Sequence, residues 1–259
     1  MNHAAIEPVI AAPDKAAPTA AQRQRNRLLE SLPTADWQHW HPQLESISLP
    51  FGHVLYESGV APTHAYFPTT AIVSLVYLSE TGASFEVAAV GNEGMVGIPI
   101  FMGGGSTSGR AVVRQAGHAW RLPARTLQQG FRDCPPLTRL LLRYTQTLIA
   151  HMSQTAACNR HHSIEQRLCL WLLQTQDRLV GDEMLVTHEL IAHAMGVRRE
   201  SVTQAIKALQ QPGLIRSTRG RIEVLDRQGL EQHACECYAV IQREYDRLFP
   251  AAPAGLRCA

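Results

Sequence analysis

The chain has 259 residues, of which 45% are apolar and 18% are charged, and its formal net charge is +2 at pH 7. This composition excludes a chain that is disordered throughout and supports either one large domain or two of ordinary size. No run of eighteen apolar residues occurs, which argues against a membrane span. No hydrophobic signal core opens the sequence, so we expect a cytoplasmic protein without membrane partners.

The cysteines are expected to be reduced thiols in small, buried side chains, because no export signal precedes them. Cys235 and Cys237 fall two residues apart in a segment that reads as a helix, so their side chains would point about 200° apart. That geometry suits neither a disulfide nor a shared metal ion. The sequence therefore predicts no metal site.

The first half of the chain predicts a flexible tail followed by a β-rich domain. Residues 1–25 are rich in Ala, Pro and Gln, and residues 27–40 read as a short helix. Short apolar runs then recur between turn signals, and the run at 85–90 alternates with period two. Such spacing is typical of a β-barrel or β-roll. The expected strands are 54–56, 65–67, 72–78, 85–90, 110–115 and 118–122.

A long helix is predicted from residue 135 to about residue 159. Pro136 suits the first turn, and apolar residues then recur at three- and four-residue steps. The members of this stripe are Leu137, Leu140, Leu141, Tyr144, Leu148 and Met152. The stripe needs an apolar surface, which is either its own domain or the same helix of a second copy, and we favour the second copy.

A second domain begins after a break near His161. Ser163 to Gln166 form a capping-box pattern that starts a new helix. Further on, Thr187 can cap a helix over 188–195, and Gly196 allows the turn into a second helix over 199–210. Two helices joined by a short turn with glycine form a helix-turn-helix, and the hairpin predicted over 214–224 would be its wing.

The second of these helices exposes side chains that can recognise bases. Arginine suits the guanine edge, glutamate accepts from cytosine, and glutamine pairs with adenine in the major groove. Between Thr187 and Leu225 six basic residues stand against three acidic ones, an excess of three positive charges that suits a phosphate-facing surface. The predicted DNA-contacting residues are Thr187, His188, Arg198, Arg199, Glu200, Ser201, Thr203, Gln204, Arg219 and Arg221.

The stretch from Thr187 to Val202 resembles the winged helix of the Crp/Fnr family of bacterial transcription regulators. The order of β-rich region, long helix and winged helix is similar too, so the resemblance covers about residues 27–226. It implies a homodimer on double-stranded DNA, with a β-roll that senses a small-molecule effector and RNA polymerase as a further partner. By position, Arg199, Glu200 and Gln204 match the base-reading residues, and His188 falls where the family often has a phosphate contact.

The region that corresponds to the family's effector site departs from its pattern. Members that bind cyclic nucleotides carry a Gly-Glu pair and, after a loop, Arg-Ser, in which the arginine meets the phosphate. Here Met95 and Val96 replace the Gly-Glu pair, and Gly109 stands at the arginine position. Cyclic-nucleotide binding is therefore disfavoured but stays open, and no cofactor is identified. The candidate effector-site residues are Glu93, Met95, Val96, Gly97 and Arg110, of which Glu93 and Arg110 could substitute only if the loop shifts register.

Two other functions fit the sequence less well. His188 and His193 resemble a zinc-protease helix motif but stand five apart, about 140° around a helix, so they cannot share one ion. We predict no enzyme and no catalytic residues. The alternative to a DNA-binding regulator is an adaptor whose winged helix binds protein instead.

The predicted fold is α+β, with a β-roll sensor similar to cupin and cyclic-nucleotide-binding domains, a long dimerisation helix and a C-terminal winged helix-turn-helix. Residues 229–249 read as one further helix, which packs either on the winged helix or against a partner. The predicted divisions are a tail over 1–25, the sensor domain over 26–134, the dimerisation helix over 135–162, the DNA-binding domain over 163–250 and a tail over 251–259.

Overall fold

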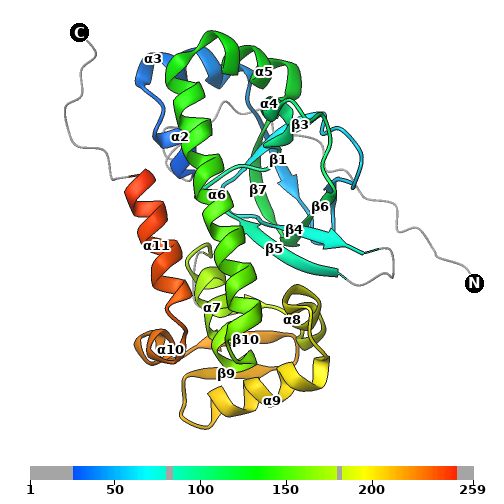
Figure 1. Cartoon of the computed structure of the whole chain (residues 1–259), viewed down its shortest axis with the longest axis vertical. Coiled ribbons are helices and arrows are strands. Elements are labelled where there is room, and N and C mark those ends of the chain that lie inside the picture. The colour runs from blue at the N-terminus through cyan, green and yellow to red at the C-terminus, as the bar shows by residue number, and fades with distance from the viewer. Residues whose placement is uncertain (1–25, 80–83, 180–182, 250–259) are drawn as a thin grey trace, which may run out of the picture.

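The computed structural model describes residues 26–79, 84–179 and 183–249. The predicted tails at 1–25 and 251–259 lie outside the described residues. In Figure 1 a β domain lies beside the upper half of one long helix, α6 (Pro135–His161), and a small helical domain with a three-stranded sheet lies at its lower end. Among the described residues no helix is long and apolar enough to cross a bilayer.

The β domain consists of two antiparallel sheets, with strand orders β1-β7-β3 and β2-β6-β4-β5. One apolar cluster takes residues from both sheets, including Leu49 of β1, Val73 of β4 and Val113 of β6. The six predicted strands are confirmed, and one more precedes them. The strands are β1 (Glu45–Leu49), β2 (Val54–Tyr56), β3 (His64–Pro68), β4 (Ile72–Leu78), β5 (Ser84–Val90), β6 (Gly109–Gln115) and β7 (Gly117–Pro123).

Short helices cover one end of this domain. The predicted helix over 27–40 is instead two helices, because Pro33 has no N–H to continue the ladder. Asn26 caps the first by accepting from the Leu29 N–H at 3.1 Å. The sequence did not predict the helices at 99–102 and 124–133. These elements are α2 (Arg27–Glu30), α3 (Thr34–Trp40), the 3₁₀ turn η1 (His41–Gln43), α4 (Pro99–Met102) and α5 (Ala124–Asp133).

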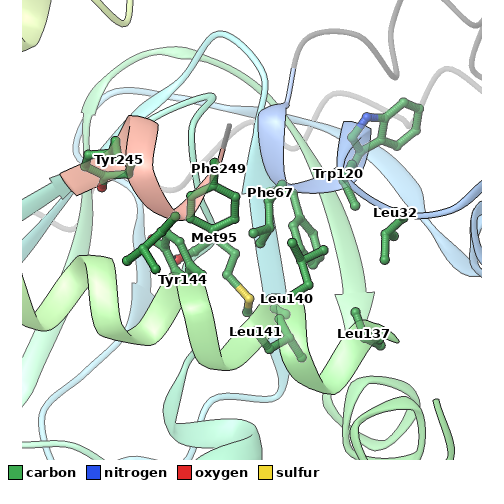
Figure 2. Packing of buried hydrophobic residues seen from close by; sticks show 14 of the residues in the cluster. Leu32, Phe67, Met95, Trp120, Leu137, Leu140, Leu141, Tyr144, Tyr245 and Phe249 are labelled. Atoms are coloured by element: carbon green, nitrogen blue, oxygen red, sulfur yellow. The ribbon is translucent and has the colours of Figure 1, made fainter. Parts of the chain in front are cut away.

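The predicted apolar stripe of α6 packs within its own chain, except for Met152. Leu140, Leu141 and Tyr144 are buried against Phe67, Met95 and residues of the C-terminal helix (Figure 2). The expectation that this stripe faces a second copy is therefore wrong. A different face of α6 is open to solvent. On it Leu142, Ile149 and Met152 are 51%, 55% and 37% exposed.

The smaller domain follows α6 after the capping box at Ser163, in which Ser163 Oγ accepts from the Gln166 N–H and the Gln166 side chain accepts from the Ser163 N–H. Its core combines Trp171, Ile191, Ile206 and Ile222. A three-stranded sheet of order β8-β10-β9 completes it, and its first strand was not predicted. The elements are α7 (Ile164–Gln176), β8 (Glu183–Leu185), α8 (His188–Met195), α9 (Arg199–Gln210), β9 (Ile215–Thr218) and β10 (Arg221–Val224).

The C-terminal segment contains two helices where the sequence predicted one, α10 (Arg227–His233) and α11 (Cys237–Leu248). Leu230 of α10 joins the core of the smaller domain, so the expected packing on the winged helix holds for α10. By contrast, α11 runs along α6 towards the β domain, where Tyr245 lies in the same cluster as Tyr144 (Figures 1 and 2). Cys235 lies in the break between the two helices, so the prediction that Cys235 and Cys237 share one helix is wrong.

Candidate nucleic-acid interface

Two helices, α8 and α9, form the predicted helix-turn-helix. Gly196 ends α8 with φ at 63°, a left-handed conformation that glycine enters without a Cβ penalty. The next N–H, of Val197, returns to the Ala192 carbonyl at 3.0 Å. Ile191 of α8 and Val202 and Ile206 of α9 are fully buried between the two helices and the sheet. The turn and the shared core therefore fix the orientation of α9 relative to α8 and leave the polar face of α9 in solvent.

The N-terminal half of α9 presents polar side chains to solvent. Arg198 is the N-cap residue, and Arg199, Glu200 and Gln204 are exposed, with the Arg199 side chain 65% accessible. The nearest acidic group to Arg199 in an ion pair is Glu189, at 3.9 Å on the surface. Such an exposed pair is weak, so the guanidinium remains available to another partner.

Two predicted contact residues on α9 are less accessible. Ser201 and Thr203 are half-buried, and the Thr203 hydroxyl donates to the Arg199 carbonyl at 3.0 Å. Both side chains are short, so they extend less far from the helix than arginine or glutamine.

His188 lies at the junction of α8, α9 and the wing. Its Nδ1 is 3.1 Å from Thr203 Oγ1, and its Nε2 is 3.3 Å from Ser217 Oγ. Partial burial, and next the positive charge of Arg199, lower the pKa of His188 below its usual value. A neutral ring bonded on both sides is better suited to join these elements than to neutralise a phosphate. The preceding residue, Thr187, accepts from the Leu190 N–H at 3.2 Å and is the predicted helix cap.

The wing carries arginines at its tip and along its strands. Arg219 is exposed in the turn beside Gly220, where φ is 76°. Arg221 is also exposed and lies 2.9 Å from Glu183 of β8. Exposed ion pairs of this kind are weak, so Arg221 remains available to bind a polyanion, and the exposed Arg219 can do the same.

His193 does not join His188 in a metal site. Its side chain is 64% exposed and lies 3.7 Å from Glu189, whereas both ring nitrogens of His188 face hydroxyl groups. The two histidines thus point to different surroundings, as five-residue spacing on a helix requires.

Most of the residues predicted for an effector site are instead buried or bonded within the β domain. Met95 and Val96 are fully buried, and the Tyr144 hydroxyl donates to the Met95 carbonyl at 2.8 Å. Gly97 has φ at 114°, a conformation that disfavours any other residue. Arg110 lies on β6 and pairs with Glu57 at 3.4 Å, so the structure does not bring it to Glu93.

Glu93 instead joins the two domains. Its Oε1 accepts from Arg178 Nε at 2.8 Å, and both of its oxygens accept from the Gly91 N–H at 3.1 Å. Arg178, which follows α7, also donates to the Ala89 carbonyl at 3.3 Å. Burial by itself would lower the pKa of Arg178, but the Glu93 carboxylate outweighs it and holds that pKa above its usual value.

A second buried arginine strengthens the same contact. Arg114 of β6 pairs with Glu86 of β5 at 2.9 Å, donates to Thr175 Oγ1 of α7 at 3.1 Å and lies over the Trp171 ring at 4.5 Å. Sequence reasoning missed both arginines, because their partners in the β domain and across the domain contact lie 28 to 89 residues away and no local spacing marks them. Together they dock the helix-turn-helix domain against the β domain.

Comparisons with known proteins agree with this architecture. A family model described as a Crp-like helix-turn-helix domain matches residues 166–233. A curated relative, the CRP-like cAMP-activated global transcriptional regulator of Mycobacterium tuberculosis, is 24% identical over 200 residues, which cover 74% of this chain and 89% of that protein.

Solved structures share the fold. A transcriptional regulator of the crp/fnr family from Eubacterium rectale superposes with a TM-score of 0.63 at 20% identity, covering 80% of this chain and 96% of that one. FixK2 from Bradyrhizobium japonicum gives 0.65 at 18% identity, covering 74% of this chain and 98% of that one. These likenesses, over most of the length of both proteins, show that the chain shares their fold.

Proposed function

We propose that this chain is a transcription regulator of the Crp/Fnr type and that it binds a two-fold symmetric operator as a homodimer. The observation that supports specific DNA binding is the solvent-facing N-terminal half of α9, where Arg199, Glu200 and Gln204 stand opposite a buried apolar face. These groups match base edges in the major groove. The half-sites are expected one helical turn of DNA apart, about 10 base pairs between centres.

The wing and the helix caps complete the proposed interface. Arg219 and Arg221 would contact phosphates on either side of the groove, with Arg198 at the N-terminus of α9. Thr187 and Ser201 can add hydroxyl contacts to the backbone. Phosphate contacts of this kind position the helix without reading sequence.

The proposed dimer uses the open face of α6. Leu142 and Ile149 are separated by seven residues and Met152 follows three later, which is the spacing of a two-stranded coiled-coil seam. These large apolar side chains are exposed in the single chain, and a second copy would bury them. We expect Ile149→Glu to convert dimer to monomer in sedimentation experiments, whereas Arg139→Glu, also exposed on α6, leaves the dimer intact.

We further propose that an effector acts through the contact between the β domain and the helix-turn-helix domain, and that RNA polymerase is the partner through which transcription changes. The curated mycobacterial relative is described as activated by cAMP. In this chain Glu93 is already paired with Arg178, and Met95 and Val96 are buried, which favours an effector other than a cyclic nucleotide. Calorimetry with cAMP and cGMP tests this, and micromolar binding of either would contradict it.

Footprinting on the DNA upstream of its own gene, with and without a small-molecule cell extract, tests the proposed function. Arg199→Ala should weaken binding to the protected site by about 1–3 kcal/mol and relax the preference at one base position. Arg243→Ala, on the exposed side of α11, is the matched control and should leave binding unchanged. If Arg199→Ala binds DNA as tightly as the wild type, and if no protected site is found for the wild type anywhere in the genome, the protein-binding adaptor is favoured instead.

A further inference from the structure

Four side chains with metal-binding atoms gather where α6 ends. Cys158 Sγ lies 3.5 Å from Cys235 Sγ, and Cys237 Sγ lies 3.4 Å from Nδ1 of His162. All four ligand atoms are within 4.8 Å of one another. The three cysteines are buried, and the His162 side chain is 16% exposed.

Two separate segments supply the four residues. Cys158 lies in the last turn of α6, and His162 is the C-cap residue that follows the helix, with its N–H donating to the Cys158 carbonyl at 3.1 Å. Gln154, one turn before Cys158, donates to Cys237 Sγ at 3.1 Å. Cys235 lies in the break between α10 and α11, and Cys237 is the first residue of α11, so both thiols can turn towards α6.

We propose that these residues form a Cys₃His site for a soft divalent metal ion, with Zn²⁺ as the ion that fits best. Three thiolates and one imidazole are a common closed, tetrahedral ligand set for structural zinc. Zinc–sulfur bonds of about 2.3 Å place tetrahedral sulfur atoms about 3.8 Å apart, close to the separation of Cys158 and Cys235. Small side-chain movements would bring the remaining ligand atoms to the same spacing. Binding converts three thiols to thiolates, so metal uptake releases protons to solvent.

The histidine is already oriented as a ligand. Its Nδ1 faces Cys237 Sγ, while its Nε2 lies 3.3 Å from a carboxylate oxygen of Glu236. Metal-binding histidines usually give their other ring N–H to a carboxylate or carbonyl, which sets the tautomer and the ring angle. A carboxylate at this position has no role in packing, since the Glu236 side chain is 69% exposed.

A bound ion would connect the segment that enters the helix-turn-helix domain to the segment that leaves it. It would attach the start of α11 to the end of α6, beside the N-cap Ser163 at which the helix-turn-helix domain begins. Cys158 and Cys235 are 77 residues apart in sequence, so the ion would close a long loop. The site uses none of the DNA-facing residues, and this proposal and the proposed function therefore fail independently.

Elemental analysis and cobalt substitution of the full chain test the site. Protein purified with reductant and zinc, then freed of loosely bound metal, should contain one zinc per chain. Cobalt in its place should show thiolate charge-transfer bands and the intense visible bands of a tetrahedral site. Cys237→Ser and His162→Ala should each remove the stoichiometric metal, whereas Cys134→Ser, at the opposite end of α6, should retain it.

A conservative variant covers the case in which a ligand variant fails to fold. Glu236→Gln leaves the buried thiols in place and should weaken zinc affinity by about 10–100-fold in a chelator competition. Zinc well below one per chain in the wild-type protein, a cobalt spectrum without thiolate bands, or equal metal loss in Cys134→Ser would overturn the proposal. A Cys158–Cys235 disulfide in freshly isolated metal-free protein would overturn it as well.

Discussion

Replacing Glu93 by glutamine isolates the ion pair that joins the β domain to the helix-turn-helix domain. The substitution keeps the size and shape of the side chain and removes its charge. Arg178 would remain protonated and buried, with only 6% of its side chain exposed, beside a neutral amide. Removing one partner of a buried pair in this way costs about 3–5 kcal/mol, because the other charge is left uncompensated.

An exposed pair of the same chemistry provides the control. Arg121 and Glu45 lie 2.6 Å apart on neighbouring strands, but their side chains are 33% and 44% exposed. Solvent screens such a pair, so Glu45→Gln should cost at most about 1 kcal/mol. The comparison therefore separates the effect of burial from that of distance, because the pair expected to contribute less stability, Arg121 with Glu45, has the shorter separation.

Urea unfolding followed by both tryptophan fluorescence and circular dichroism measures the two costs and shows whether the transition is two-state. The double variant Glu93→Gln with Arg178→Met should recover part of the loss, because no buried charge then remains unpaired. If Glu93→Gln costs no more than Glu45→Gln, or if the double variant is less stable than Glu93→Gln alone, the reasoning about this contact is wrong.

Three further predictions concern pH, packing and DNA affinity. Burial, more than nearby arginines, lowers the pKa of His151 to about 3, so the unfolded chain binds the extra proton first as pH falls below about 6.5. Stability should therefore drop by about 2 kcal/mol more between pH 7 and pH 5 in the wild type than in His151→Gln, and equal drops in urea titrations would refute this. Gly94→Ala should cost about 1–3 kcal/mol because its Cβ would overlap the buried Tyr144 ring, whereas thermal melts of Gly104→Ala, whose Cβ meets only an ordinary contact, should match wild type. Arg219→Ala should weaken DNA binding evenly across sequences and reduce the salt slope by about one, and a change in base preference in a binding screen would argue against a phosphate contact.

Sequence alone was sufficient for the elements whose signals are local. The strand at 85–90, the capping box at Ser163 and the cap and turn at Thr187 and Gly196 each depend on residues within a few positions, and the structure contains each of them. The exposed face of α9 follows from the same periodicity, because apolar residues at helical spacing must turn inward and leave the others outward.

Contacts between distant segments could be decided only by the tertiary structure. Periodicity identified an apolar stripe on α6 but not its partner, and α11 and the β domain cover that stripe. Likewise Glu93 meets Arg178 across 85 residues of sequence, and Cys158 meets Cys235 across 77. Such pairs depend on the path of the whole chain, and a break of three residues between α10 and α11 is enough to bring together two cysteines that one continuous helix would have separated.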